Sequence, residues 1–138
     1  MSGQPIRIAE RTLATLRERS KRRGEPLARL AQRYIEEGLR TDDHPGIVFR
    51  DGPAGRRAGL VGGPDVWEVV GALRSVPESG EARVAALAER IGLSEAKVRT
   101  AIRYYSEYPE EIDSWIAAND AEAERLEAAF ARERELLA

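Results

Sequence analysis

Residues 84–105, with the sequence VAALAERIGLSEAKVRTAIRYY, decide the fold that we expect for this chain. Apolar residues recur at positions 84, 87, 88 and 91 and again at 98, 101, 102 and 105, which is the spacing of two amphipathic helices. Between them, Gly92 can take the left-handed conformation that ends a helix, and Ser94 can cap the next helix. The stretch therefore predicts a helix-turn-helix.

The second helix of this pair has two different faces. At about 100° per residue, Val98, Ile102 and Tyr105 are predicted to point into the core. The opposite face is short and basic, and it is formed by Ala96, Arg99, Thr100 and Arg103. Small residues and arginines on one face can enter a DNA major groove, with Arg99 and Arg103 as contacts. The alternative is a helix pair that only packs and whose arginines are solvated.

Composition excludes several classes of protein. The chain has 138 residues, of which 42% are hydrophobic and 33% charged, and this balance is typical of one ordinary domain or two small ones. It has no Cys and a single His, His44, which we interpret as a linker or turn side chain and not a ligand. No nucleophile–base pair or metal-ligand spacing is present, so we expect no enzyme and no cofactor. No membrane span or signal-peptide core is apparent, and a cytoplasmic protein is expected.

Charge is distributed unevenly along the chain, although the formal net charge is only −2. Residues 1–40 carry ten Lys/Arg and five Asp/Glu, residues 41–106 carry nine of each, and residues 107–138 carry three and ten. A basic head and an acidic tail predict two different partners, of which one is a polyanion.

The N-terminal residues predict a short strand followed by two helices. Residues 5–9 alternate, with Ile6 and Ile8 on one side. A helix is then expected from Thr12, as N-cap, to Gly24, and a second from Pro26. A lone strand has no ladder partner for its backbone groups, so the natural partner is the same strand of a second chain.

This arrangement resembles the ribbon-helix-helix repressors of the Arc/MetJ/CopG type, in the run Ile6-Arg7-Ile8-Ala9 followed by helix, Gly24 and helix. The resemblance implies an obligate dimer whose ribbon lies in the major groove, with Arg7 reading bases. Glu25 departs from the family pattern, because an acid stands where the second helix usually grips phosphate. The implied contacts are Arg7, Lys21, Arg22 and Arg23 for DNA and Ile6, Ile8, Leu30 and Tyr34 for dimerisation. The alternative is an ordinary helical hairpin with a frayed N-terminus.

The middle of the chain predicts a second module. Pro45-Gly46 marks the boundary, and residues 47–50 and 56–60 flank a glycine-containing loop, which predicts a hairpin. Arg56 and Arg57, with Arg50, can contact phosphate as a wing or can be solvated. A helix follows from residues 63–65, with Trp67 expected in the core. Hairpin, helix, helix, turn and helix follow one another in a winged-helix-like order.

Four segments of this module are similar to a small bacterial family of winged-helix, antitoxin-like (VapB-like) proteins, often encoded with PIN-type toxins. They are residues 44–47, 55–58, 65–70 and 92–105, and the match that they define spans about half of the chain. Residues 74–80 are an expansion relative to the usual members. The resemblance implies an antitoxin with two modules of DNA-binding type.

The acidic tail predicts one long helix from Pro109 to the end of the chain. Its apolar seam can lie on its own domain, on another copy or in a groove of another protein. We expect Ile112, Trp115 and Ile116 to pack at home and the later part to bind a partner. The candidate partner-binding residues are Trp115, Ile116, Leu126, Phe130, Arg132, Arg134 and Leu137.

Taken together, the sequence predicts a mainly α protein: a ribbon-helix-helix module in residues 1–41, a winged-helix-like domain in 42–108 and an acidic helix in 109–138. The expected function is that of a bacterial type II antitoxin, which represses its own operon and neutralises a PIN-type ribonuclease. The expected partners are operator DNA, that toxin, and further copies of the chain in a homodimer or a higher even-numbered oligomer. The alternative is a dimeric repressor without a toxin. Arg132 and Arg134 can pair with a nuclease's metal-binding acids or with neighbouring acids of their own helix.

Overall fold

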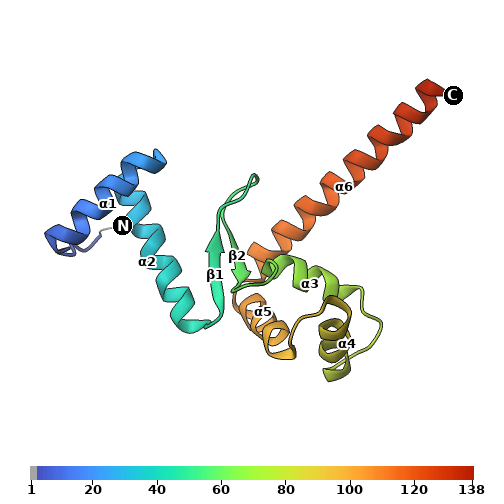
Figure 1. The fold of residues 1–138 in the computed structure, drawn as a ribbon, viewed down its shortest axis with the longest axis horizontal. Helices are drawn as coiled ribbons and strands as arrows, with labels where there is room; N and C mark the ends of the chain where they lie inside the picture. The colour runs from blue at the N-terminus through green and yellow to red at the C-terminus, as the bar shows by residue number, and fades with distance from the viewer. Residues whose placement is uncertain (1–2) are drawn as a thin grey trace. The chain divides into compact units, whose positions relative to one another are not determined.

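The computed structural model describes residues 3–138, which form six helices and one two-stranded hairpin (Figure 1). The expected mainly α composition is confirmed. Two compact units divide the chain, one ending at Asp42 and the other running from Asp43 to Ala138. In the described part of the chain, no helix has the length and apolar character needed to cross a membrane.

The first unit consists of α1 (Glu10–Arg23) and α2 (Leu27–Asp43). Gly24 ends α1 with a φ of 66°, and the N–H of Glu25 donates to the carbonyl of Ser20 over 3.1 Å, as in a helix-ending turn. The predicted order of helix, Gly24, helix is confirmed. Helix α1 starts two residues before the predicted cap, because Ala9 and not Thr12 precedes its first turn.

The strand predicted over residues 5–9 is wrong for the single chain. Residues 3–9 have no regular secondary structure, and the one sheet among residues 3–138 is the β1–β2 hairpin. A strand requires a neighbour for its backbone N–H and C=O groups, and this chain offers none to residues 5–9. The alternating side chains are therefore not sufficient to form a strand here.

The second unit begins with an antiparallel hairpin of β1 (Ile47–Arg50) and β2 (Arg57–Leu60). The register places Ile47 opposite Leu60 and Arg50 opposite Arg57. Ile47 and Leu60 are buried and attach the base of the hairpin to the core of the unit. The predicted hairpin is confirmed, with its second strand one residue shorter than expected.

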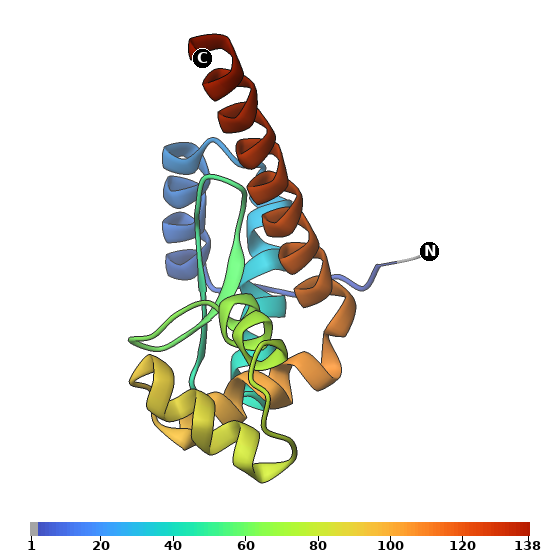
Figure 2. The same ribbon diagram turned by 90° about the vertical axis from the view of Figure 1, so that its right-hand side faces the viewer.

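Three helices then build the core of this unit: α3 (Val66–Arg74), α4 (Glu81–Ile91) and α5 (Glu95–Glu107). The turn between α4 and α5 is as predicted, because Gly92 has a φ of 67° and the Ser94 side chain accepts from the N–H of Lys97 over 3.2 Å. Helix α3 packs against both α4 and α5. Figure 2 shows α4 and α5 joined by this tight turn.

The core-facing side of α5 is centred one residue away from the prediction. Val98, Ala101 and Tyr104 are fully buried, whereas Ile102 and Tyr105 are only partly buried. The hydroxyl of Tyr104 donates to the carboxylate of Glu111 over 2.7 Å, which satisfies the one polar group of its ring. A tyrosine can lie at the centre of the buried face of α5 because the following helix supplies a hydrogen-bond acceptor for its hydroxyl.

The last helix, α6 (Pro109–Leu137), begins at Pro109 as predicted and is continuous to the end of the chain. Ile112 and Ile116 are buried against the rest of the unit, which confirms their expected packing at home. Beyond residue 116, the side chains of α6 are exposed, apart from the half-buried Ala129. Both views show this part of α6 projecting beyond α3 and α5 (Figures 1 and 2).

Candidate nucleic-acid and protein interfaces

The segment that precedes α1 leaves its apolar side chains uncovered. Ile6 is 75% exposed and Ile8 is 36% exposed, and Ala9 has the extended dihedral angles φ −58° and ψ 143°. Arg7 lies between the two isoleucines, is exposed, and makes no ion pair with the described residues. The segment therefore presents one free cation between two unburied apolar side chains.

Basic residues gather at the C-terminal end of α1, where the helix dipole favours cations. Lys21 is exposed, and Arg22 is 3.9 Å from the equally exposed Glu18, a distance that leaves the guanidinium free to bind elsewhere. Arg23 is 3.0 Å from Glu25. The three predicted DNA contacts thus share one helix end, with Lys21 and Arg22 more available than Arg23.

Glu25 is the acid that departs from the ribbon-helix-helix pattern, and the structure compensates its charge. Its carboxylate accepts from Arg33 over 2.6 Å and from Arg23 over 3.0 Å. The hydrogen bond from Arg33, followed by that from Arg23, lowers the pKa of Glu25 below its ordinary value. Arg33 was not predicted from the sequence as part of this site. Two arginines thus offset the charge of Glu25, and Arg33 also lies 3.7 Å from the carboxylate of Glu37.

The dimerisation residues predicted on α2 behave differently from one another. Leu30 is fully buried within the chain and is therefore not available as a contact between chains, which corrects that assignment. Tyr34 is half-buried, and its hydroxyl accepts from Arg19 of α1 over 3.3 Å. Ile35 and Leu39 are 51% and 60% exposed, although their helical spacing is that of a core face. The uncovered apolar surface of α2 lies at these two residues.

Contacts within the unit occupy much of the basic face predicted on α5. The Arg99 guanidinium pairs with Glu81 at the start of α4, an interaction that raises the pKa of Arg99 and lowers that of Glu81. A Cβ atom at Gly46 would lie 3.5 Å from the methyl group of Thr100, so the turn before β1 covers this part of α5. Arg103 is exposed and has no ion pair among residues 3–138. The sequence predicted Thr100 on the outward face of this helix, but its side chain is partly covered by the turn.

The arginines of the hairpin are held by the unit itself. Arg57 pairs with the buried Asp65, and Arg50 donates to the other oxygen of the same carboxylate over 3.1 Å. Arg56 pairs with Asp51 across the loop at 3.1 Å. The Arg57 guanidinium closes the base of the hairpin and is not a solvated wing side chain, and its contact with phosphate stays a prediction.

His44 lies at the bend between α2 and β1, in agreement with its interpretation as a linker or turn side chain. It is buried, with its ring 5.4 Å from that of Tyr104 and 6.0 Å from that of Tyr108. Its Nε2 atom is 3.3 Å from the carboxylate of Glu107. Residues 3–138 contain no group of three or more His, Cys, Asp or Glu placed to hold a metal ion.

Candidate partner-binding residues on α6 fall into two groups. Ile116 is buried in its own unit and Trp115 is half-buried, so Ile116 is not available to a partner. Leu126, Phe130 and Leu137 are 43%, 58% and 78% exposed. Arg132 and Arg134 are exposed and have no ion pair in the described part of the chain. The uncovered apolar stripe of α6 therefore starts at Leu126.

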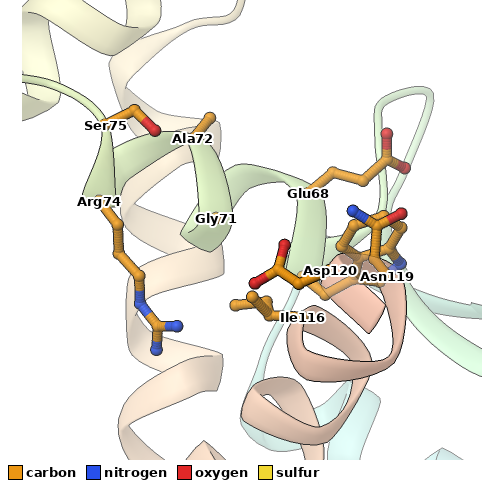
Figure 3. Close-up of a pocket in the computed structure, with 9 residues that line it drawn as sticks. Glu68, Gly71, Ala72, Arg74, Ser75, Ile116, Asn119 and Asp120 are labelled. Carbon is orange, nitrogen blue, oxygen red and sulfur yellow. The ribbon is translucent and has the colours of Figure 1, made fainter. Parts of the chain in front are cut away.

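Two adjoining depressions lie beside the first half of α6. One, of about 540 Å³, lies between α3 and α6, and Figure 3 shows Asp120 and Arg74 on opposite sides of it. The other, of about 390 Å³, lies between α6, the start of α3 and the hairpin loop. Trp67, Glu68 and Asn119 line both depressions. Trp67 is half-buried at their common edge, whereas the sequence predicted that it lies in the core.

Comparison of the chain with protein-family models, curated proteins and solved structures gave no match.

Proposed function

We propose that the chain is a dimeric DNA-binding repressor that also binds and neutralises a partner protein, as an antitoxin does. The observation that carries this proposal is that both ends of the chain leave apolar side chains uncovered, and that these ends have opposite charge. Ile6, Ile35 and Leu39 are exposed at the basic end, and Leu126, Phe130 and Leu137 at the acidic end. Uncovered apolar surface of this kind marks interaction sites.

At the basic end, the proposed partners are a second chain and DNA. Leu30 is the one fully buried side chain that α1 and α2 contribute, and so small a core needs oligomerisation for stability. Pairing of residues 5–9 with the same residues of a second copy would form the strand that one chain cannot form. Arg7 would then lie on the exposed side of a two-stranded ribbon, and Lys21 and Arg22 would add phosphate contacts.

At the acidic end, the proposed partner is a protein with an apolar groove. Residue 122 is the last residue of α6 that lines a depression with α3 or the hairpin loop, and the side chains that follow are exposed apart from the half-buried Ala129. A solitary helix of this kind gains stability when its apolar side is covered. The resemblance to VapB-like proteins makes a PIN-type nuclease the candidate. In that complex, the exposed Arg132 and Arg134 would pair with the acids that hold the nuclease's metal ions.

A truncated chain tests the proposal. Removal of residues 124–138 takes away the uncovered part of α6 and none of the buried core. The truncated protein should bind the DNA upstream of its own coding region as the full chain does, but should fail to suppress the toxicity of the neighbouring gene product on co-expression. Full neutralisation by the truncated chain would remove α6 from the toxin site.

The alternative function is a dimeric repressor in which α6 pairs only with α6 of another copy. The spacing of Leu126, Phe130, Glu133 and Leu137 by four and three residues favours it, because this is the spacing of a coiled-coil seam. Under this alternative, a sedimentation measurement would show that the truncated chain forms a smaller oligomer than the full chain. No neighbouring gene product would co-purify with the full chain.

A further inference from the structure

The two depressions beside α6 form one groove, which we call the tryptophan groove and define by Trp67, Glu68, Trp115, Asn119 and Asp120. The depressions join along Trp67, Glu68 and Asn119, which line both. Trp67 comes from α3 and Trp115 from α6, and both indole side chains are half-buried. Volumes of about 390 and 540 Å³ are large enough to receive side chains of another molecule.

Most charged groups around the tryptophan groove are already compensated. Arg57 pairs with Asp65, Arg74 pairs with Asp113, and Glu122 accepts from Arg125 over 2.9 Å. The Arg74 pKa is raised by its hydrogen bonds to Asp113 and Tyr105. These pairs leave the groove without a free cation among the described residues.

Two carboxylates in the groove remain uncompensated. Glu68 accepts one hydrogen bond, from the N–H of Asp65 over 3.2 Å, and has no ion pair with residues 3–138. Asp120 has neither a hydrogen bond nor an ion pair within the same residues, and Figure 3 shows its carboxylate turned towards Gly71, into the space between α3 and α6. The groove therefore combines two indole rings with two free negative charges.

A guanidinium or ammonium group matches both features. Arginine stacks on indole faces and also donates to carboxylates, and its weak hydration lowers the cost of leaving water. A phosphate or a nucleic acid backbone would be repelled by the same charges. The ligand that complements the groove is accordingly a cationic side chain with apolar neighbours.

The position of the groove on α6 indicates that the ligand belongs to a polypeptide. At about 100° per residue, Trp115, Asn119 and Glu122 lie on the same side of the helix as the uncovered Leu126, Phe130 and Leu137. A chain that covered the stripe would reach the groove by continuing along the helix. The groove and the stripe thus form one continuous surface.

We propose that the tryptophan groove binds an arginine-bearing segment of the partner protein, with a guanidinium on Trp67 between the carboxylates of Glu68 and Asp120 and an apolar neighbour of that arginine beside Trp115. The continuity with the stripe rests on the function proposed above, whereas the chemistry of the groove does not. The groove would give the interface its specificity for a basic segment, since the stripe itself selects only for apolar residues.

Tryptophan fluorescence of the full chain tests this proposal, because the sequence contains two Trp and both lie in the groove. The probe is the peptide acetyl-Leu-Arg-Leu-Arg-Leu-amide, compared with the peptide that carries citrulline in place of both arginines. We expect a saturable change in emission with a Kd of about 1 mM or tighter for the arginine peptide. The citrulline peptide should bind at least about tenfold more weakly, because it lacks the charge.

Two matched variants separate charge recognition from non-specific binding. The Glu68→Gln/Asp120→Asn variant keeps the shape of both side chains and the acceptor for the Asp65 N–H, and it should weaken arginine-peptide binding at least about tenfold. The Glu124→Gln/Glu127→Gln variant removes two exposed charges of α6 outside the groove and should leave binding unchanged. Equal affinity for both peptides, an unaffected first variant or an absent emission change would each overturn the proposal.

The chain without residues 124–138 distinguishes this proposal from the proposed function. The residues that line the groove all remain, and the loss of Arg125 adds the free carboxylate of Glu122, so this truncated chain should bind the arginine peptide at least as tightly as the full chain. Loss of toxin neutralisation with normal peptide binding would support both ideas. If the truncated chain fails to neutralise the toxin and even the full chain does not bind the peptide, the proposed role of α6 in toxin binding would be supported and the proposed arginine site in the groove would be refuted.

Discussion

The Arg57 guanidinium of β2 pairs with the buried carboxylate of Asp65, the residue that precedes α3. Arg50, which lies directly opposite Arg57 in the hairpin, donates to the other oxygen of that carboxylate over 3.1 Å and to the carbonyl of Gly63 over 3.0 Å. Two like charges facing each other across strands normally repel, and here one buried carboxylate pairs with both arginines and reduces that repulsion. Asp65 thereby fixes the hairpin to the first helix of the core.

Replacement of Asp65 by Asn should destabilise the second unit by about 2–4 kcal/mol, because it leaves two half-buried arginines facing each other without a counter-charge. Chemical denaturation followed by circular dichroism measures this loss as a lower midpoint. Asp51→Asn is the matched control, since Asp51 pairs with Arg56 at the exposed loop and should cost less than about 1 kcal/mol. Equal losses in the two variants would show that the buried carboxylate has no special role.

A side chain at position 59 should disturb the ion pairs that Arg50 and Arg57 make with Asp65, because Gly59 lies beside the Arg50 guanidinium. An added Cβ atom would lie 1.9 Å from a terminal nitrogen of Arg50, so Gly59→Ala must displace the guanidinium from Asp65. We expect a loss of about 1–3 kcal/mol, the cost of breaking the charged hydrogen bond from Arg50 to Asp65, since the guanidinium itself can move aside. The melting temperature in a thermal scan reports this change.

Gly71→Ala is the control for this substitution. Its added Cβ would be 4.0 Å from Ile116, an ordinary contact distance, and an alanine inside α3 favours the helix by about 0.5–1 kcal/mol. Gly71→Ala should therefore raise the melting temperature. If Gly59→Ala raised it as well, Arg50 would not be held at the position described.

Ionised Glu25 should contribute to the free energy of unfolding, and this contribution should be lost at acid pH. The pKa of this carboxyl is lowered in the folded chain by Arg33 and Arg23, so its contribution is present above the ordinary pKa of 4.5 and is lost as pH falls through the lower, folded-state pKa. Carboxyl chemical shifts should show a titration midpoint for Glu25 below the ordinary value of 4.5. The Arg33→Gln variant should move the Glu25 midpoint back towards 4.5. An unchanged midpoint in that variant would contradict the assignment of Arg33 as the main cause.

Sequence patterns predicted those parts of the fold that depend on local chemistry. Gly24 and Gly92 end helices in the left-handed conformation, and Ser94 caps α5, because the residues that require these features lie within a turn of one another. Periodicity did not choose the centre of the core face of α5. It favoured Ile102 and Tyr105 over Tyr104, whose burial depends on an acceptor, Glu111, supplied by α6.

The candidate sites were less predictable because they depend on contacts between elements. Arg57 has the same sequence context as a solvated wing arginine, and only the folded position of Asp65 shows why it is held. The tryptophan groove brings Trp67 and Trp115 together from two helices, and no spacing within either helix signals it. The predicted strand at residues 5–9 failed for a related reason, since its pairing partner is not present in one chain.

Arg7 provides the sharpest test of DNA recognition. It is the exposed cation of residues 3–9, and in a paired ribbon it would face base edges, so Arg7→Ala should weaken binding to the upstream DNA by about 1–3 kcal/mol and reduce discrimination against unrelated DNA. Lys21→Ala should instead weaken both DNAs equally and lower the salt dependence by about one unit of slope, as expected of a phosphate contact. Arg103→Ala tests α5 in the same gel-shift assay at fixed salt. Unchanged binding by the Arg7 variant together with lost binding by the Arg103 variant would move the DNA site from the N-terminal segment to the helix-turn-helix.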